Sequence, residues 1–228
     1  MAGKIHRYDC YDLRKFGPED IGVFLDIGAQ IGSTTIQARI LNAAARVIAL
    51  EPCRETFEIL ETNMKYWNTE CYNVALGPGN PMCFIQKGSS GLNRFVDEND
   101  KQWWPEDVPY MTESKTLVQM FVDYNIQTDV PYIIKIDCEG GERYILREEG
   151  ALDLIRGSVM TVMEIHIGFG GTSEQWTQWF KKLSDTHDLL LAGWQKGKDG
   201  KKYVYVPCDT LPIKGRYQIE LMNKSWPA

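Results

Sequence analysis

An acidic residue and two glycines follow an apolar run early in the chain, and a second acidic residue follows the next apolar run. The first group is Asp26, Gly28 and Gly32, and the second is Glu51. Such apolar runs are typical of buried parallel strands, and ligands bind outside the carboxyl ends of those strands. Glycines let a ligand approach the backbone, and a carboxylate ending the second strand can hold ribose hydroxyls. The pattern predicts a site for a nucleoside cofactor.

The glycine spacing separates two kinds of nucleoside cofactor. A dinucleotide site has the spacing G-x-G-x-x-G, because the pyrophosphate contacts the backbone and the next helix N-terminus. Here Gln30 stands where the second glycine would be. S-adenosylmethionine (SAM) has no phosphate, and its sulfonium and ammonium groups suit Asp26 better. We therefore predict a SAM site, rather than a purely structural turn, formed by Asp26, Gly28, Ala29, Gln30, Gly32 and Glu51.

A second acidic segment lies in the middle of the chain. One apolar run leads to Asp137 and Glu139, and another leads to Glu164 and His166. If both strands belong to the parallel sheet, these four side chains emerge at the same carboxyl edge as the predicted SAM site. We predict all four as catalytic residues, with Asp137 also adjoining the cofactor.

Methyl transfer to oxygen accounts for this choice of residues. The reaction is an in-line displacement, so alignment of acceptor, methyl and sulfur accelerates it greatly. A hydroxyl is a poor nucleophile at neutral pH, and a base or a metal ion is useful. Asp137 or His166 could be that base. Alternatively, Asp137 with Glu139, Glu164 or His166 could hold a divalent metal such as Mg²⁺.

Other residues of the second segment have structural interpretations. Glu142 in the first turn of a helix is favourable through the helix dipole alone, so we take it as structural. Glu139 could simply cap backbone donors of the turn. Lys135 inside an apolar strand is expected to be the buried partner of a carboxylate.

The pattern of elements predicts an α/β fold, with a class I methyltransferase (Rossmann-like), doubly wound, mostly parallel sheet that ends in an antiparallel hairpin. Apolar stripes at helical spacing predict helices that pack on the sheet. The hairpin is expected around Asp199-Gly200, between residues 189–193 and 203–207, rather than another βαβ unit. The strand candidates are residues 22–27, 46–50, 71–76, 132–137 and 159–165; the helical stripes are Phe57, Leu60, Met64, then Leu117, Met120, Phe121, Tyr124, then Trp176, Trp179, Phe180, Leu183.

We expect a single domain over residues 1–228, since neither a repeat nor a linker is evident. Residues 77–115 are the least regular part and hold several prolines, glycines and aromatic residues. Long segments of this kind are often functional. We interpret this one as a substrate loop or lid, the alternative being a surface excursion with its own small core.

Composition limits the partners. The net charge is −6 and the sequence pI about 5.2, which argues against generic binding to nucleic acid. The six cysteines include no C-x-x-C pair, so we expect free packing thiols, Cys53 and Cys138 included, and a cytoplasmic location. We expect no membrane span. The expected partner is a small-molecule or glycan acceptor; oligomeric state stays open.

Read together, the two acidic segments resemble the FkbM family of SAM-dependent methyltransferases. The matching pieces run in the family's order over roughly residues 22 to 166. The most specific is Lys135-Ile136-Asp137-Cys138-Glu139-Gly140-Gly141-Glu142; the others are Phe24-Leu25-Asp26-Ile27-Gly28-Ala29-x-x-Gly32, Val47-Ile48-Ala49-Leu50-Glu51-Pro52, Asn73-Val74-Ala75-Leu76-Gly77, Thr116-Leu117 and Met163-Glu164-Ile165-His166.

The resemblance implies methylation of hydroxyl groups, often on sugars or polyketide-type products. It also implies that the first turn and Glu51 hold SAM, that Ala75 lies near the adenine, and that Asp137 and Glu139 lie by the transferred methyl. Gln30 replaces the family's common asparagine, an amide for an amide. Three alternatives remain: an N-methyltransferase on the same scaffold, a non-catalytic SAM- or nucleotide-binding module, and a nicotinamide dehydrogenase, which the incomplete glycine pattern disfavours.

Overall fold

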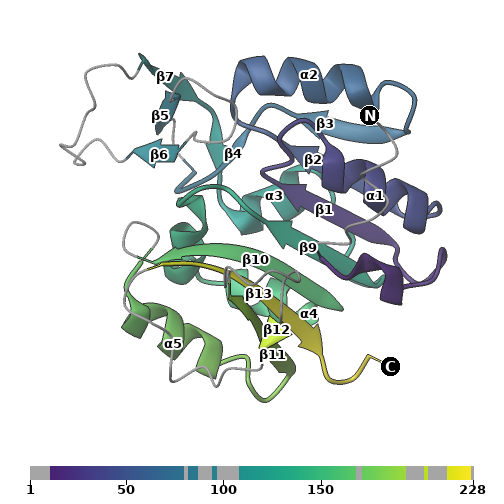
Figure 1. The fold of residues 1–228 in the computed structure, drawn as a ribbon, viewed down its shortest axis with the longest axis vertical. Coiled ribbons are helices and arrows are strands. Elements are labelled where there is room, and N and C mark those ends of the chain that lie inside the picture. Colours follow the sequence, from purple (N-terminus) through teal and green to yellow (C-terminus); the bar gives the residue numbers. More distant parts are fainter. Residues whose placement is uncertain are drawn as a thin grey trace, which may run out of the picture.

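The computed structural model describes residues 11–79, 82–86, 94–96, 108–167, 171–193, 203–204 and 215–226. An eight-stranded sheet lies at the centre of the molecule, in the spatial order β12-β11-β13-β10-β9-β1-β2-β3 (Figure 1). The strands are β1 (Val23–Ile27), β2 (Arg46–Leu50), β3 (Thr69–Tyr72), β9 (Tyr132–Ile136), β10 (Met160–Ile167), β11 (His187–Gly193), β12 (Tyr203–Val204) and β13 (Gly215–Asn223).

Five neighbouring strands, β3, β2, β1, β9 and β10, run parallel to one another. The residues of β1, β2, β9 and β10 are almost entirely buried, which explains their near-continuous apolar runs, whereas β3 at the edge of this group is partly exposed. The order reverses direction at β1, from which the chain moves first to β2 and later to β9. This reversal is the topological switch point at which doubly wound sheets bind ligands.

Helices cover both faces of the sheet (Figure 1), because successive strand residues point to opposite sides. Phe24 packs with η2 and α1, whereas Leu25 packs with α3, α4 and α5. The helix α2 covers Ala49 on the first face. The helical elements are η2 (Leu13–Lys15), α1 (Ser33–Leu41), α2 (Arg54–Met64), α3 (Leu117–Asp123), η3 (Gly141–Arg147), α4 (Ala151–Gly157) and α5 (Ser173–Lys181). The predicted doubly wound α/β fold is confirmed.

The three predicted apolar stripes lie on α2, α3 and α5 or directly after them, and they face the sheet. Buried stripe residues include Leu60 and Met64 on α2, Leu117 and Met120 on α3, and Trp176 on α5. Both α3 and α5 begin with a complete capping box, in which threonine and glutamine side chains satisfy each other's backbone donors. These stripes therefore build the core and carry no site.

The end of the sheet differs from the prediction in one respect. The expected pairing of residues 189–193 with 203–207 is present, since β11 and β12 are antiparallel. However, β13 lies between β10 and β11 and is antiparallel to both. Consequently β10 and β11 run in the same direction, and α5 joins them in a βαβ unit that precedes the predicted hairpin. The turn residues 194–202 lie outside the described part of the chain.

The predicted strand over residues 71–76 is two strands. β3 ends at Tyr72, and β4 (Ala75–Leu76) leaves the main sheet to pair with β8 (Ser114–Lys115). Asn73 separates them because its side chain donates to the backbone carbonyls of Glu51 and Pro52, at 2.8 and 2.9 Å. The chain therefore bends around the carboxyl end of β2.

The segment 77–115 contains strands, which its composition did not predict. β5 (Met82–Gln86) pairs with β6 (Arg94–Val96) and with β7 (Val108–Thr112) in a three-stranded antiparallel sheet. This small sheet stands apart from the large one (Figure 1). Residues 80–81, 87–93 and 97–107 lie outside the description, so its proposed role as a substrate loop stays a prediction.

Two further expectations concern cysteines and membranes. Cys53 and Cys138 are free and buried, as predicted for packing thiols. Among the described residues, every helix is too short or too polar to cross a bilayer.

Candidate active site

The first glycine turn is held against the carboxyl end of β2. The backbone N–H groups of Gly28 and Ala29 both donate to the carbonyl of Leu50 at 2.9 Å. The next N–H, that of Gln30, donates to the Glu51 carboxylate, also at 2.9 Å. Gln30 takes a left-handed conformation with φ of 54° to do so. These hydrogen bonds hold the turn and Glu51 together at the carboxyl edge, where the sequence predicted both.

The glycines of this turn are required by packing within the protein. Gly28 has φ of 77°, and a Cβ there would lie 1.8 Å from the carbonyl oxygen of Asp137. Gly32 has φ of 91°, and its Cβ would meet Met64 Cε at 2.6 Å. Close approach of the two turns after β1 and β9 therefore explains Gly28, and packing against α2 explains Gly32.

Asp26 is fully buried beneath this turn. One carboxylate oxygen accepts a hydrogen bond from Thr35 Oγ1 at 2.6 Å, and the other lies 3.0 Å from Lys135 Nζ. Lys135 also donates to the carbonyl of Gly28 at 2.6 Å. Lys135 is therefore the buried partner of a carboxylate, as predicted, and the pair supports the turn from inside the protein.

Glu51 is nearly buried, with 6% exposure, and its two oxygens each accept one backbone N–H. The donors are Gln30 and Cys53, both at 2.9 Å. Burial raises the pKa of this carboxyl group to about 7, and the two hydrogen bonds oppose that rise. Because a carboxylate can accept about four hydrogen bonds, Glu51 keeps capacity for two hydroxyl donors.

The second turn places two carboxylates at the same edge. The Asp137 N–H donates to the carbonyl of Ile27 at 3.0 Å, which fixes the start of the turn beside β1. Asp137 and Glu139 are both partly exposed. Glu139 has φ of 49°, a left-handed conformation that a residue with a side chain adopts only when its surroundings hold it.

The predicted catalytic residues on β10 lie beside this turn. Met163 pairs with Ile136 in the parallel register, so Glu164 is level with Asp137. His166 Nε2 lies 3.1 Å from Glu139 Oε2. All four residues therefore emerge at one edge, as expected from the sequence, and the contact of His166 with Glu139 joins the two strands.

Glu142 has a different role from the one that its helical position suggested. Its carboxylate is completely buried and accepts from Nδ1 of His166 at 2.8 Å. It also accepts from the backbone N–H groups of His166 and Gly140, at 2.9 and 2.8 Å. This set of bonds to β10 and to the turn, rather than the helix dipole alone, accounts for the position of Glu142.

Two carboxylates therefore enclose His166, which is only 4% exposed. Glu139 and Glu142 raise the pKa of the imidazole to about 10, although burial opposes that rise. His166 is consequently protonated at neutral pH and cannot accept a proton there. The composition of the segment could not reveal this state, since it depends on the side chain of Glu142.

Tyr11 is a site neighbour that sequence reasoning missed. It lies close enough to Lys135 and Asp137 for their charges to act on its phenol, and burial raises its pKa. It precedes η2 and packs against the apolar cluster beneath the site. Nothing in its local sequence indicated this position.

Metal binding was left open by the sequence. Among the residues that the structure describes, no group of three or more histidine, cysteine or acidic side chains has a geometry that could hold a metal ion.

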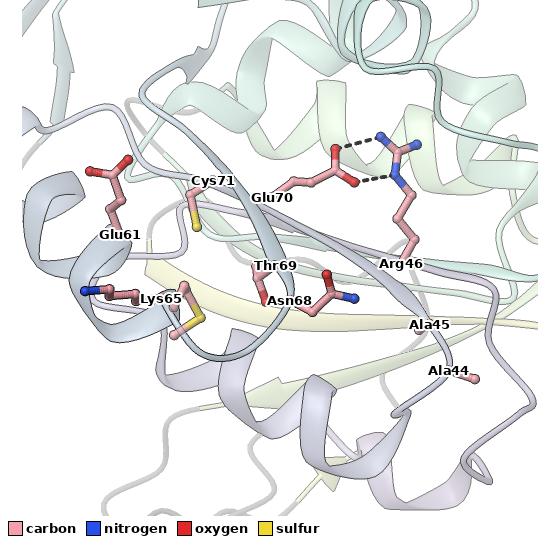
Figure 2. Close-up of a pocket in the computed structure, with 10 residues that line it drawn as sticks. Ala44, Ala45, Arg46, Glu61, Lys65, Asn68, Thr69, Glu70 and Cys71 are labelled. Carbon is pink, nitrogen blue, oxygen red and sulfur yellow. Dashed lines mark hydrogen bonds and ion pairs between the residues drawn. The ribbon is translucent and has the colours of Figure 1, made fainter.

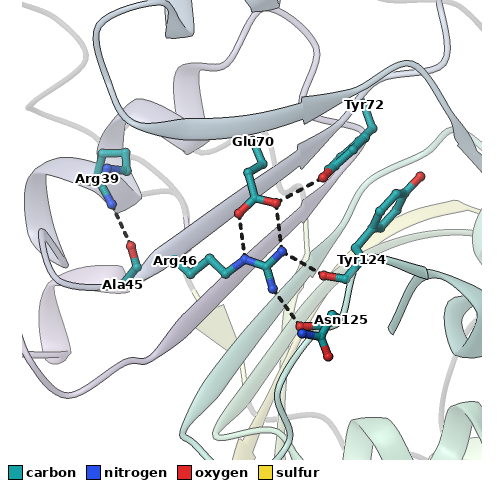
Figure 3. A network of polar contacts seen from close by, with 7 residues as sticks. All are labelled: Arg39, Ala45, Arg46, Glu70, Tyr72, Tyr124 and Asn125. Atoms are coloured by element: carbon teal, nitrogen blue, oxygen red, sulfur yellow. Dashed lines mark hydrogen bonds and ion pairs between the residues drawn. The ribbon is translucent and has the colours of Figure 1, made fainter. Parts of the chain in front are cut away.

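A pocket of about 470 Å³ lies at the opposite, amino edge of the sheet (Figure 2). Its lining includes Arg46 and Thr69, which begin β2 and β3. Arg46 binds Glu70 through two nitrogens, at 2.7 and 2.8 Å, and donates to the carbonyls of Tyr124 and Asn125 (Figure 3). This network ties β2 and β3 to the end of α3, so we assign the pocket no catalytic role.

The residues at the carboxyl edge suit SAM. Glu51 has acceptor capacity for ribose hydroxyls, and three partly exposed acidic residues, Asp137, Glu139 and Glu164, lie at the same edge, where a sulfonium would be near acceptors of its charge. Asp26 exposes no surface, so it acts through Lys135 and the turn. Ala75, which begins β4 after the chain bends around the end of β2, is buried. Its N–H donates to the carbonyl of Glu113 at 2.9 Å.

The fold and this edge define a class I methyltransferase. The methyltransferase FkbM domain matches residues 26–212, most of the chain, and the chain therefore belongs to the FkbM methyltransferase family. It is a SAM-dependent methyltransferase, as the two acidic segments indicated. No curated protein sequence matches the chain.

Solved structures share the fold. An FkbM methyltransferase from Methylobacillus flagellatus KT is 14% identical with a TM-score of 0.50, over 89% of this chain and 44% of that one. A putative rRNA-methylase from Clostridium thermocellum is 10% identical with a TM-score of 0.51, over 94% of this chain and 93% of that one. At these identities the likeness concerns the fold alone.

Proposed function

We propose that this protein is an O-methyltransferase that acts on a hydroxyl group of a sugar, a glycan or another small natural product. The observation that carries the proposal is the pair of partly exposed carboxylates, Asp137 and Glu139, at the carboxyl edge beside the glycine turn after β1. His166 is held as a cation behind Glu139, so the base in this proposal is a carboxylate.

When bound, SAM supplies an electrophilic methyl group on a positively charged sulfur. The acceptor oxygen forms a bond to that methyl carbon as the carbon–sulfur bond breaks, and the hydroxyl proton passes to Asp137. The products are a methyl ether and S-adenosylhomocysteine. Asp137 is better placed for the proton than Glu139, because Glu139 is already paired with His166.

The cofactor residues of the proposal are those of the first turn and its neighbours. Glu51 would hold the ribose, and the 28–32 turn would face the cofactor with its backbone, with Ala75 near the adenine. Asp26 would act from behind by holding Lys135. Glu164, partly exposed and level with Asp137, would contribute negative charge rather than a proton acceptor.

Asp137→Asn tests the proposal most directly. Purified protein is incubated with SAM and a panel of sugars and alcohols, with and without Mg²⁺, and methyl ethers are measured by mass spectrometry. General-base catalysis contributes about 10²–10⁴-fold, so kcat should fall by that factor while SAM affinity changes little. Asp153→Asn, an exposed carboxylate on α4, serves as the matched control. The proposal is overturned if the protein neither binds SAM nor yields a methylated product with any hydroxyl acceptor.

Other acceptors are outcomes of the same panel. An amine needs less help from a base, so an N-methyltransferase would keep near-full turnover in Asp137→Asn. RNA belongs in the panel because the Clostridium structure carries an rRNA-methylase title, although the acidic net charge of −6 disfavours it. Tight SAM binding without turnover on any acceptor would support a non-catalytic SAM-binding module.

Cofactor choice is tested by thermal unfolding with SAM, S-adenosylhomocysteine and NAD. A ligand at 100 times its Kd adds about 2.7 kcal/mol to the free energy of unfolding, which raises Tm by several degrees. Stabilisation by the two sulfur ligands and not by NAD is expected. Stabilisation by NAD alone would favour the dehydrogenase alternative.

A further inference from the structure

Glu142 makes four contacts from a position without any solvent access. Oε1 accepts from the backbone N–H of His166 at 2.9 Å and lies 2.8 Å from its Nδ1. Oε2 accepts from the Gly140 N–H at 2.8 Å and from the Cys138 thiol at 3.6 Å. One buried carboxylate thus joins the turn after β9 to the end of β10.

The other side of the imidazole faces the acceptor edge. His166 Nε2 lies 3.1 Å from Glu139 Oε2, and the Glu139 side chain is 28% exposed. Glu142, His166 and Glu139 therefore form a line from the core to the surface. The backbone of Glu139 is left-handed, with φ of 49°, a conformation that few residues with a side chain adopt.

We propose that Glu142 is a positioning residue for methyl transfer, which holds His166 so that His166 fixes the Glu139 carboxylate at the acceptor side. The inference rests on the proposed function, since it takes the carboxyl edge as the place where the acceptor binds. It adds that the methyl-transfer geometry depends on two residues that contact neither acceptor nor cofactor, Glu142 and His166.

Anchoring of the backbone alone does not account for the pairing of Glu142 with a histidine. Two backbone N–H groups already satisfy the buried carboxylate in part, and the imidazole adds a charged group that reaches from Glu142 to Glu139. Here both nitrogens of one imidazole lie against carboxylate oxygens, so the ring can neither flip nor rotate without breaking an ion pair. The charged groups that act on the ring are Glu139 and Glu142, and β13 places Arg216 opposite His166 in the register.

The first test observes the imidazole directly and needs no acceptor. The chain has three histidines, so ¹⁵N-histidine NMR resolves them, and His166→Gln identifies the signal of His166. In the unmodified protein the signal should remain that of an imidazolium up to pH 9. In Glu142→Gln, which keeps the side-chain shape and removes the charge, the pKa of His166 should fall by at least about one unit. A neutral His166 at pH 7.5, or an unchanged titration in the variant, overturns the inference.

The second test uses kinetics and a matched control. Glu142→Gln should lower kcat about tenfold or more, while the KM for SAM stays within threefold of its original value. In the pH profile of this variant, kcat should fall at the alkaline pH at which its His166 loses a proton. Glu148→Gln is the control, because Glu148 also accepts two backbone N–H groups, those of Leu117 and Val118, but lies away from His166. It should lower stability without changing the kcat profile.

Glu139→Gln covers the case in which Glu142→Gln does not fold. Glu139 is partly exposed, so its replacement should leave the fold intact. The pKa of His166 and kcat should both fall in this variant. Turnover in the acceptor panel with an unaltered kcat profile in these variants refutes the inference and leaves the proposed function standing. If no acceptor reacts, the proposed function fails, and the histidine spectra alone decide whether the positioning line exists.

Discussion

The turns after β1 and β9 are built alike and used differently. Each is adjoined by one fully buried carboxylate that is paired with a basic side chain from the neighbouring strand. In the first turn Asp26 pairs with Lys135 of β9, and in the second Glu142 pairs with His166 of β10. The first turn exposes Gln30 and Ile31, neither of which is charged, whereas the second exposes the acidic residues Asp137 and Glu139 in part.

This difference matches what each turn would contact. In the proposed function, backbone groups of the first turn and one acceptor carboxylate, Glu51, would hold the cofactor, so Asp26 beneath that turn can remain inside. Proton transfer needs side chains that reach the acceptor, so the second turn exposes two acids and buries a third to hold them. The buried pair beside each turn rigidifies the turn, and the pair with histidine loses its charge only as the pH rises towards 10.

Breaking the first pair should give the largest effect. Asp26→Asn leaves Lys135 as a buried cation without its carboxylate, which typically costs about 3–5 kcal/mol. Urea unfolding measures the change. The double variant Asp26→Asn with Lys135→Met should recover more than half of that loss, since both charges are then gone. A cost below about 1 kcal/mol in Asp26→Asn would show that the two turns are not held in the same way.

The pH dependence of stability should distinguish the two pairs. A histidine whose pKa is raised from 6.5 to about 10 contributes stability that is complete below pH 6.5 and is lost as the pH rises through 10. The pKa of Glu51 is raised from 4.5 to about 7, so its ionisation lowers the free energy of unfolding as the pH rises from 4.5 to 7. Above pH 7.5 this contribution no longer changes with pH. Between pH 7.5 and 10 the free energy of unfolding of the protein should therefore fall by about 2–3 kcal/mol more than that of the His166→Gln variant.

Urea unfolding at several pH values in that window gives the two slopes. Parallel curves for the protein and His166→Gln would mean that the second pair is not ionised in the folded state, contrary to the comparison of the two turns.

The contact between the turns is tested by the difference between two glycine variants, which should be about 1–3 kcal/mol. Gly28→Ala places a Cβ 1.8 Å from the Asp137 carbonyl oxygen at a positive φ, whereas Gly150→Ala has a positive φ but meets only Val118 Cγ2 at 3.2 Å. Both substitutions cost about 1 kcal/mol through backbone strain, and Gly28→Ala should add about 1–3 kcal/mol for the forced shift. Equal costs in urea unfolding would mean that the second turn moves freely relative to the first.

Much of the fold and of the site follows from local sequence. Continuous apolar runs are what parallel strands buried on both faces require, and the acids after those runs must share one edge because the strands are parallel. Lys135 could be predicted as a carboxylate partner, since an unpaired charge inside a strand is too costly to retain. The stripes on α2, α3 and α5 follow from helical periodicity.

Only the tertiary structure decided the rest, because it depends on contacts between residues distant in sequence. β13 enters the sheet from the end of the chain and makes β10 and β11 parallel, an order that no local pattern of residues 187–204 contains. Gly28 is needed because Asp137 approaches it, and Glu142 is buried because His166 of β10 lies above it. Local residue types determined which chemistry this edge can perform; the packing of β9 against β1 and β10 determined which of its acids are exposed to perform it.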